Sequence, residues 1–268
     1  MTGTGTASDP FVPDNWDELI TACGTSGAVI SLPEGGEWDM NEQYPENTPT
    51  VNLNGCKING NGFTIRNLRI KNNDIFTSSR ASTISNLDIV NLYSAPANDK
   101  FLFDCIYIIT LNNVRVSGEV VNTSLIRSSS GNSYLHGYSC SFNLHLVNGN
   151  LGNYGSMQFY NGTNIKLTGT TSNSTFYVGS LYDESQIEGA ILSTNGNSVF
   201  KVSYAKLAKI NIGLSGFSEV DTSTTYNTVI NTSIIDATTI SSQLIQATAE
   251  QMKNADWLTQ HGFPAFWG

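Results

Sequence analysis

Apolar and polar residues alternate along most of this chain, and one phrase of three residues, apolar then polar then apolar, recurs many times. Its copies are centred on Asn52, Arg69, Asp88, Arg115, Asn143, Lys166, Glu188 and Asn211. The centres lie 17 to 28 positions apart. Alternation predicts strands with one buried face, and a period of roughly 20 to 50 residues is typical of solenoids. The pattern therefore predicts a parallel β-helix built from stacked coils.

The middle residues of the phrase are expected to point outward and to stack in one column, about 4.8 Å apart. Opposite charges would then alternate at Arg69, Asp88 and Arg115, and again at Lys166 and Glu188. Such cross-strand pairs stabilise a sheet by roughly 0.2 to 1 kcal/mol each. We interpret the column as scaffolding, because glycoside hydrolysis needs two carboxylates that face one bond.

Three further segments predict individual elements. Residues 14–23 predict an amphipathic helix with an Asp or Asn cap and Gly24 after its end, which would cover the open end of the solenoid. Residues 101–110 form a dense apolar run, which predicts a strand buried on both sides. Residues 247–258 predict a helix capped by Thr248, and three aromatic residues follow near the end of the chain.

Together these patterns predict an all-β fold, a single-stranded, right-handed parallel β-helix of about eight coils and roughly 40 Å in length. One elongated domain suffices for 268 residues, because a solenoid grows by adding coils. The expected divisions are an N-terminal arm and acidic cap at 1–50, the β-helix at 51–240, and a C-terminal helix and aromatic tail at 241–268.

The N-terminal end differs from the rest of the chain in its charge. The net charge is −9, and residues 1–56 contain nine acidic residues but no Lys or Arg. Such an end could orient assembly or simply keep that end soluble. Because Lys and Arg are not clustered, no nucleic-acid binding is expected. No apolar run of about 18 residues occurs, so no membrane insertion is expected, and the N-terminus lacks the features of a secretory signal.

The residues that could carry chemistry are few. Four well-separated cysteines predict buried structural thiols, and the histidines lack metal or triad spacing, so no metal, cofactor or catalytic residue is expected. One carboxylate cluster in the coils is a candidate glycan site, although a solvated turn also explains it. Its residues are Tyr177, Tyr182, Asp183, Glu184 and Glu188.

The C-terminal aromatic residues are candidates for docking. They are Trp257, Phe263, Phe266 and Trp267. Leaving them exposed would be costly, since each can bury about 150 to 250 Å². They are expected either to pack on the last coil or to insert into a partner protein. Both alternatives make the C-terminus a docking surface.

Two stretches resemble a known fold family. Residues 27–36 read Gly-Ala-Val-Ile-Ser-Leu-Pro-Glu-Gly-Gly, and residues 58–65 read Ile-Asn-Gly-Asn-Gly-Phe-Thr-Ile. With the preceding helix, they resemble the opening of right-handed parallel β-helices of the pectin-lyase-like superfamily. Polygalacturonase-like members carry Asn-Thr-Asp, Asp-Asp, Gly-His-Gly and Arg-Ile-Lys in that order. Here only Arg69-Ile70-Lys71 is present, in an early coil, so the resemblance implies the fold and not this activity.

The arm around residues 5–10 and the ending at 249–258 also resemble small virion structural proteins of phages and prophages of Gram-positive gut bacteria. This resemblance implies a non-enzymatic protein of the virion surface, namely a capsid decoration, head fibre or tail appendage. We expect a homotrimer, attached to other virion proteins through one terminus, with host-cell glycans as candidate ligands. Two alternatives stay open: a polysaccharide lyase or glycoside hydrolase on a β-helix scaffold, and a bacterial surface adhesin, which the missing secretory signal disfavours.

Overall fold

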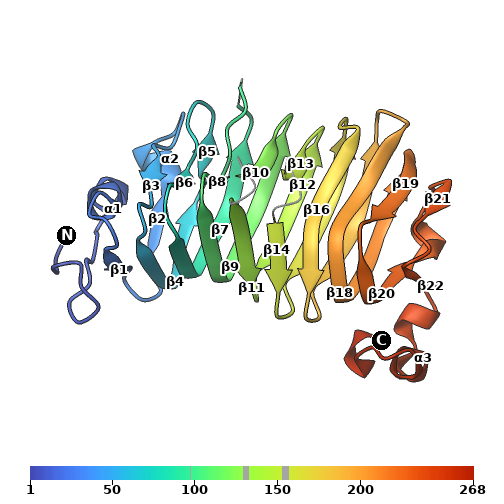
Figure 1. The fold of residues 1–268 in the computed structure, drawn as a ribbon. Coiled ribbons are helices and arrows are strands. Elements are labelled where there is room, and N and C mark those ends of the chain that lie inside the picture. The colour runs from blue at the N-terminus through green and yellow to red at the C-terminus, as the bar shows by residue number, and fades with distance from the viewer. Residues whose placement is uncertain (97, 129–132, 153–156) are drawn as a thin grey trace.

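A computed structural model describes residues 1–96, 98–128, 133–152 and 157–268, which form a β-solenoid of about 8 turns (Figure 1). The strands pair almost entirely in parallel, each with strands of the preceding and following coils. Alternate side chains point inward, so every coil adds one layer to a continuous core. The predicted parallel β-helix is confirmed.

The strands form three faces, which we number in the order in which the chain visits them. The first face is built from β1 (Val29–Ser31), β4 (Lys57–Arg66), β7 (Ser82–Ser94), β9 (Ile108–Val121), β11 (Tyr134–Tyr138), β14 (Met157–Tyr160), β16 (Thr175–Tyr182), β18 (Ser198–Ser215) and β20 (Thr225–Asn231). Several of these strands are long and bend at a corner, so they continue onto a neighbouring face.

The second face adds shorter strands to the continuing halves of β4, β7, β9, β18 and β20. These strands are β2 (Glu37–Asp39), β12 (Ser141–Val147), β15 (Asn164–Thr171), β17 (Gln186–Ser193) and β22 (Ile245–Ala247). At its far edge β5 (Arg69–Ile70) pairs with β7.

The third face closes each coil. It contains the first halves of β16 and β18, together with β3 (Val51–Asn52), β6 (Phe76–Ser78), β8 (Phe103–Cys105), β10 (Ser124–Ser128), β13 (Asn150–Gly152), β19 (Phe217–Thr222) and β21 (Thr239–Ile240). Its inward rings stack between coils: Phe76 lies over Phe103 at 5.8 Å and Phe176 over Phe200 at 5.9 Å between ring centroids.

At least one residue per coil has left-handed backbone geometry at the bend between the first and second faces, which we call the first corner. Such geometry turns the chain sharply, and Asn tolerates it better than most residues. The first residue with positive φ at this corner is, in successive coils, Asn61, Asn86, Asn113, Ser139, Asn161, Asp183, Leu207 and Asn227. The first corner therefore runs along the whole rod as a line of bends.

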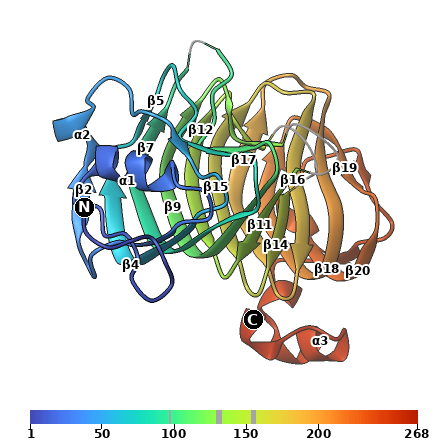
Figure 2. The same ribbon diagram turned by 60° about the vertical axis from the view of Figure 1, so that its left-hand side comes forward.

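The N-terminal end is closed by the predicted helix, α1 (Trp16–Cys23), which lies at the end of the rod in Figure 2. The Asn15 side chain caps it by accepting a hydrogen bond from the Glu18 amide at 3.0 Å. Trp16 is buried in the core, where its ring lies 5.8 Å from that of Phe76. A second helix, α2 (Met40–Gln43), follows β2. No helix in the described ranges is long and apolar enough to cross a membrane.

The C-terminal segment leaves the rod after β22 and lies against the outside of the last coils (Figure 1). Its elements are the 3₁₀ turns η2 (Gln251–Lys253) and η3 (Ala265–Trp267) and the helix α3 (Ala255–Gln260), while η1 (Thr232–Ile234) follows β20. The Thr248 hydroxyl accepts a hydrogen bond from the Gln251 amide at 3.2 Å, but the continuous helix predicted over 247–258 is wrong. The chain is extended at Asn254, whose side chain caps α3 by accepting from the Trp257 amide at 2.9 Å.

The dense apolar run at 101–110 is also not one buried strand. It divides into β8 and the start of β9, and between them Ile106 and Tyr107 are exposed. The chain turns from the third face to the first face at this point. The apolar pattern alone could not reveal that turn.

The predicted single outward column is split among faces. Asn143, Lys166, Glu188 and Asn211 do share one register on the second face, and Asp88 lies opposite Arg115. However, Arg69 lies opposite Tyr93 and not Asp88, while Asn52 belongs to the third face. The sequence phrase identifies outward positions correctly, but copies on different faces cannot stack.

Candidate functional site

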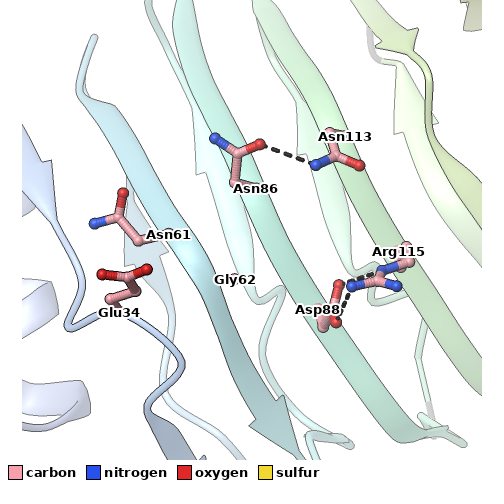
Figure 3. A pocket seen from close by; sticks show the side chains of 7 residues that line it. All are labelled: Glu34, Asn61, Gly62, Asn86, Asp88, Asn113 and Arg115. Atoms are coloured by element: carbon pink, nitrogen blue, oxygen red, sulfur yellow. Dashed lines mark hydrogen bonds and ion pairs between the residues drawn. The ribbon is translucent and has the colours of Figure 1, made fainter.

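A groove of about 500 Å³ opens on the first corner in the N-terminal half of the rod (Figure 3). Its lining residues are Glu34, Asn61, Gly62, Asn86, Asp88, Asn113 and Arg115. They come from the loop after β1 and from β4, β7 and β9, so three successive coils and the cap contribute. We call this feature the corner groove.

Amide side chains form one wall of the corner groove. Asn113 Nδ2 donates to Asn86 Oδ1 at 2.9 Å, and Asn86 Nδ2 donates to Asn59 Oδ1 at 3.0 Å. The three asparagines lie in successive coils, so the stacking of strands fixes their spacing. Each amide still has a donor or an acceptor that can face a ligand, because an amide carries two N–H groups and two oxygen lone pairs.

An ion pair forms another part of the wall. Arg115 Nε and Nη2 donate to the two oxygens of Asp88, both at 2.7 Å (Figure 3). This bidentate geometry fixes the orientation of the guanidinium group. Both Asp88 oxygens therefore accept from Arg115, while the guanidinium keeps further N–H groups for a ligand.

The floor and the far side of the corner groove are open. Gly62 has φ of +76°, and no heavy atom lies within 4 Å of the place where a Cβ would be. A side chain at this position would project into free space. Glu34 stands beside Asn61, across the groove from Asp88 (Figure 3). The arrangement offers hydrogen-bond donors and acceptors to a polar ligand such as a sugar.

The predicted glycan cluster is only partly brought together. Tyr182 ends β16, and Asp183 and Glu184 follow it in the first corner with φ of 49° and 69°. Glu188 lies farther along on the second face, in β17. Tyr177 lies on the third face and packs partly against the core.

The C-terminal aromatic residues differ in exposure. Phe263 and Trp267 are buried in a small second core with Met252 and Leu258, whereas Phe266 is 70% exposed. Trp257 packs against the edge of this core. The Lys209 ammonium donates to the Trp267 carbonyl, which ties the segment to β18, and burial lowers the pKa of Lys209. Docking of a partner at these residues stays a prediction.

Part of the corner groove could be predicted from equal spacing between residues. Asn86 and Asn113 are 27 residues apart, as are Asp88 and Arg115. Equal spacing between two coils places such side chains opposite each other, as the register of Asp88 and Arg115 shows. Asp88 and Arg115 were recognised as outward residues, but Glu34 and the asparagines were not.

Metal-ligating side chains and cysteines are the other groups that could carry chemistry. Within the described ranges, no group of three or more His, Cys, Asp and Glu side chains is placed to hold a metal ion. Cys23, Cys56, Cys105 and Cys140 are buried free thiols. Comparison with protein-family models, with curated proteins and with solved structures gave no match.

Proposed function

We propose that this chain is a non-enzymatic structural protein of a phage virion surface that binds host-cell glycans. A capsid decoration, a head fibre and a tail appendage are the roles that suit a rod with two unlike ends. The rod would assemble as a homotrimer and attach to other virion proteins through one terminus. Support for an attachment end comes from Phe266, which is exposed in the C-terminal segment.

The corner groove carries the glycan part of the proposal. Its amides and guanidinium match the hydroxyls of a sugar, and the glycine floor leaves room for one. Both oxygens of Asp88 are engaged by Arg115, so this carboxyl group would have to leave its partner before it could act as an acid. This arrangement favours binding over bond cleavage.

A panel of neutral and acidic oligosaccharides tests the glycan part by calorimetry. We expect binding without release of new reducing ends or unsaturated products. Asn113→Asp keeps a residue that tolerates left-handed geometry but replaces the side-chain amide in the groove wall with a carboxylate. It should weaken binding roughly tenfold or more. Asn122→Asp is the matched control, because Asn122 also has positive φ but does not line the groove. Equal loss in both variants would count against the groove.

The virion location and the trimer need separate measurements. Antibodies against the purified chain should label phage particles from the strain that carries the gene, at a fixed position on the particle. Light scattering should give three times the 29.0 kDa of one chain. Label that never sediments with particles would overturn the virion assignment.

A polysaccharide hydrolase or lyase is the second candidate, because Glu34 and Asp88 both line the corner groove. Glycosidases use two carboxyl groups on either side of the scissile bond. If this candidate holds, the wild-type chain cleaves a glycan, and Glu34→Gln or Asp88→Asn abolishes the cleavage. That result would replace the non-enzymatic proposal.

A further inference from the structure

Five tyrosines in the second half of the chain are separated by equal steps of 22 residues. They are Tyr138, Tyr160, Tyr182, Tyr204 and Tyr226. They belong to β11, β14, β16, β18 and β20, which are successive strands of the first face. The residues directly before the first three, Gly137, Phe159 and Leu181, are buried, as is Ala205 directly after Tyr204, so these four tyrosines occupy outward positions. We call this row the tyrosine ladder.

The rings of the tyrosine ladder stack closely. Centroids lie 4.8 Å apart between Tyr138 and Tyr160, 4.6 Å between Tyr160 and Tyr182, and 4.9 Å between Tyr182 and Tyr204. The first two pairs are nearly parallel, with interplanar angles of 11° and 8°. Tyr226 is tilted by 53° from Tyr204 and is 58% exposed. Four rings thus form a continuous stack, and the fifth ring is tilted out of it and largely exposed.

The surface of the stack consists of ring edges and phenol groups. Burial raises the pKa of Tyr160 to about 12, so its hydroxyl stays protonated and can donate a hydrogen bond. Tyr160 Oη donates to Gln158 Oε1 at 2.7 Å. His136 lies beside Tyr160 with its ring centroid 6.2 Å away, and burial lowers the pKa of His136 and favours the neutral imidazole.

The fixed charges of this strip lie from Tyr182 onward, toward its C-terminal end. The stretch from Tyr138 to Tyr182 presents hydroxyl, amide and neutral aromatic groups on its outer side. Lys206 lies opposite Tyr182 and, in the next coil, opposite Tyr226, and Asp183 and Glu184 lie in the adjoining first corner. A ligand that covers Tyr138 and Tyr160 with the adjacent His136 and Gln158 would therefore meet no fixed charge.

We infer that the tyrosine ladder is a binding strip for a neutral, linear polysaccharide, an inference that rests on the proposed glycan-binding function. A row that repeats once per coil suits a polymer whose own units repeat at a similar length. Tyrosines lose little conformational entropy on binding, and these are already held by their neighbours. The phenol groups can hydrogen-bond sugar hydroxyls, and the open face of Tyr226 can stack on a sugar ring.

Calorimetry with cellohexaose and laminarihexaose as neutral probes, and a hexagalacturonate as the anionic probe, tests this inference. The wild-type chain should bind at least one neutral probe more tightly than the anionic probe. The double variant Tyr160→Ala/Tyr182→Ala should weaken that binding roughly tenfold or more. Tyr93→Ala is the matched control, since Tyr93 is an exposed tyrosine on another part of the rod, and it should bind as the wild type does.

Folding is checked by circular dichroism and thermal melting of each variant. If the double variant does not fold, Tyr160→Phe keeps the stack and removes one hydroxyl, and it should weaken binding several-fold. Unchanged affinity in the folded ladder variants overturns the inference but leaves the proposed function standing if Asn113→Asp still weakens binding. Tighter binding of the hexagalacturonate than of both neutral probes also overturns the inference. If the wild-type chain binds no glycan, both the inference about the tyrosine ladder and the proposed glycan binding are refuted. The labelling experiment decides the virion assignment separately.

Discussion

Replacing Arg127 by Met should destabilise the solenoid much more than replacing Arg115 by Met. Both arginines form bidentate ion pairs with an aspartate of the preceding coil, with both N–O distances at 2.7 Å. The pairs differ in burial. The Asp104 side chain is 3% and the Arg127 side chain 33% exposed, whereas Asp88 is 20% and Arg115 65% exposed.

The expected loss of stability in each variant follows from this difference in burial. Removing one partner of a buried pair costs about 3 to 5 kcal/mol, because the remaining charge is left without compensation. An exposed pair contributes about 0 to 1 kcal/mol. Since 1 kcal/mol corresponds to roughly 2 to 4 °C in Tm for a chain of about this size, Arg127→Met should lower Tm by roughly 6 to 20 °C and Arg115→Met by at most roughly 4 °C.

Thermal melting followed by circular dichroism measures both shifts under identical conditions. The double variant Asp104→Leu/Arg127→Met should recover much of the loss, because it leaves no unpaired charge. The effect of Arg115→Met should shrink at about 1 M salt, where exposed charges are screened. Equal shifts for the two single variants would refute the reasoning from burial.

Three further predictions concern other parts of the fold. Gly189→Ala should lower Tm strongly, because the new Cβ would lie 1.9 Å from the Leu167 carbonyl oxygen, whereas Gly196→Ala, which meets nothing within 4 Å, should cost much less. Burial lowers the pKa of His136, so Tm should fall as the pH drops below about 6.5, and His136→Gln should reduce that slope in a pH series. Trp267→Ala should release the C-terminal segment to limited proteolysis while the melting of the rod changes little, since the segment has its own core.

Local patterns predicted the elements that depend on local interactions. The Asn15 cap and the buried Trp16 of α1 follow from spacing within one helix. Alternation likewise separates inward from outward residues in β4 and β15. Both signals act over a few residues, so a single sequence contains them in full.

Contacts between coils were harder to predict, because alternation does not say on which face a strand lies. Arg69 and Asp88 are both outward residues, yet they lie in different rows, and so their charges do not alternate in one column. The break at Asn254 was missed because helical propensity outweighed a possible cap inside the segment. The corner groove and the tyrosine ladder were missed although their equal spacing of 27 and 22 residues is visible in the sequence.

The number of residues between successive coils changes along the rod, and this change explains why different surfaces occur on it. Coils can differ in length because each loop outside the strands absorbs extra residues without shifting the first corner, where every coil places at least one residue with positive φ. Like side chains then come together beside that corner, as Asn86 and Asn113 do at a spacing of 27 residues and Tyr138 and Tyr160 at a spacing of 22. At the last coils the corner is covered by the C-terminal segment, which packs on Val229 and Leu207. The first corner is therefore the structural line along which both proposed glycan surfaces and the C-terminal segment are arranged.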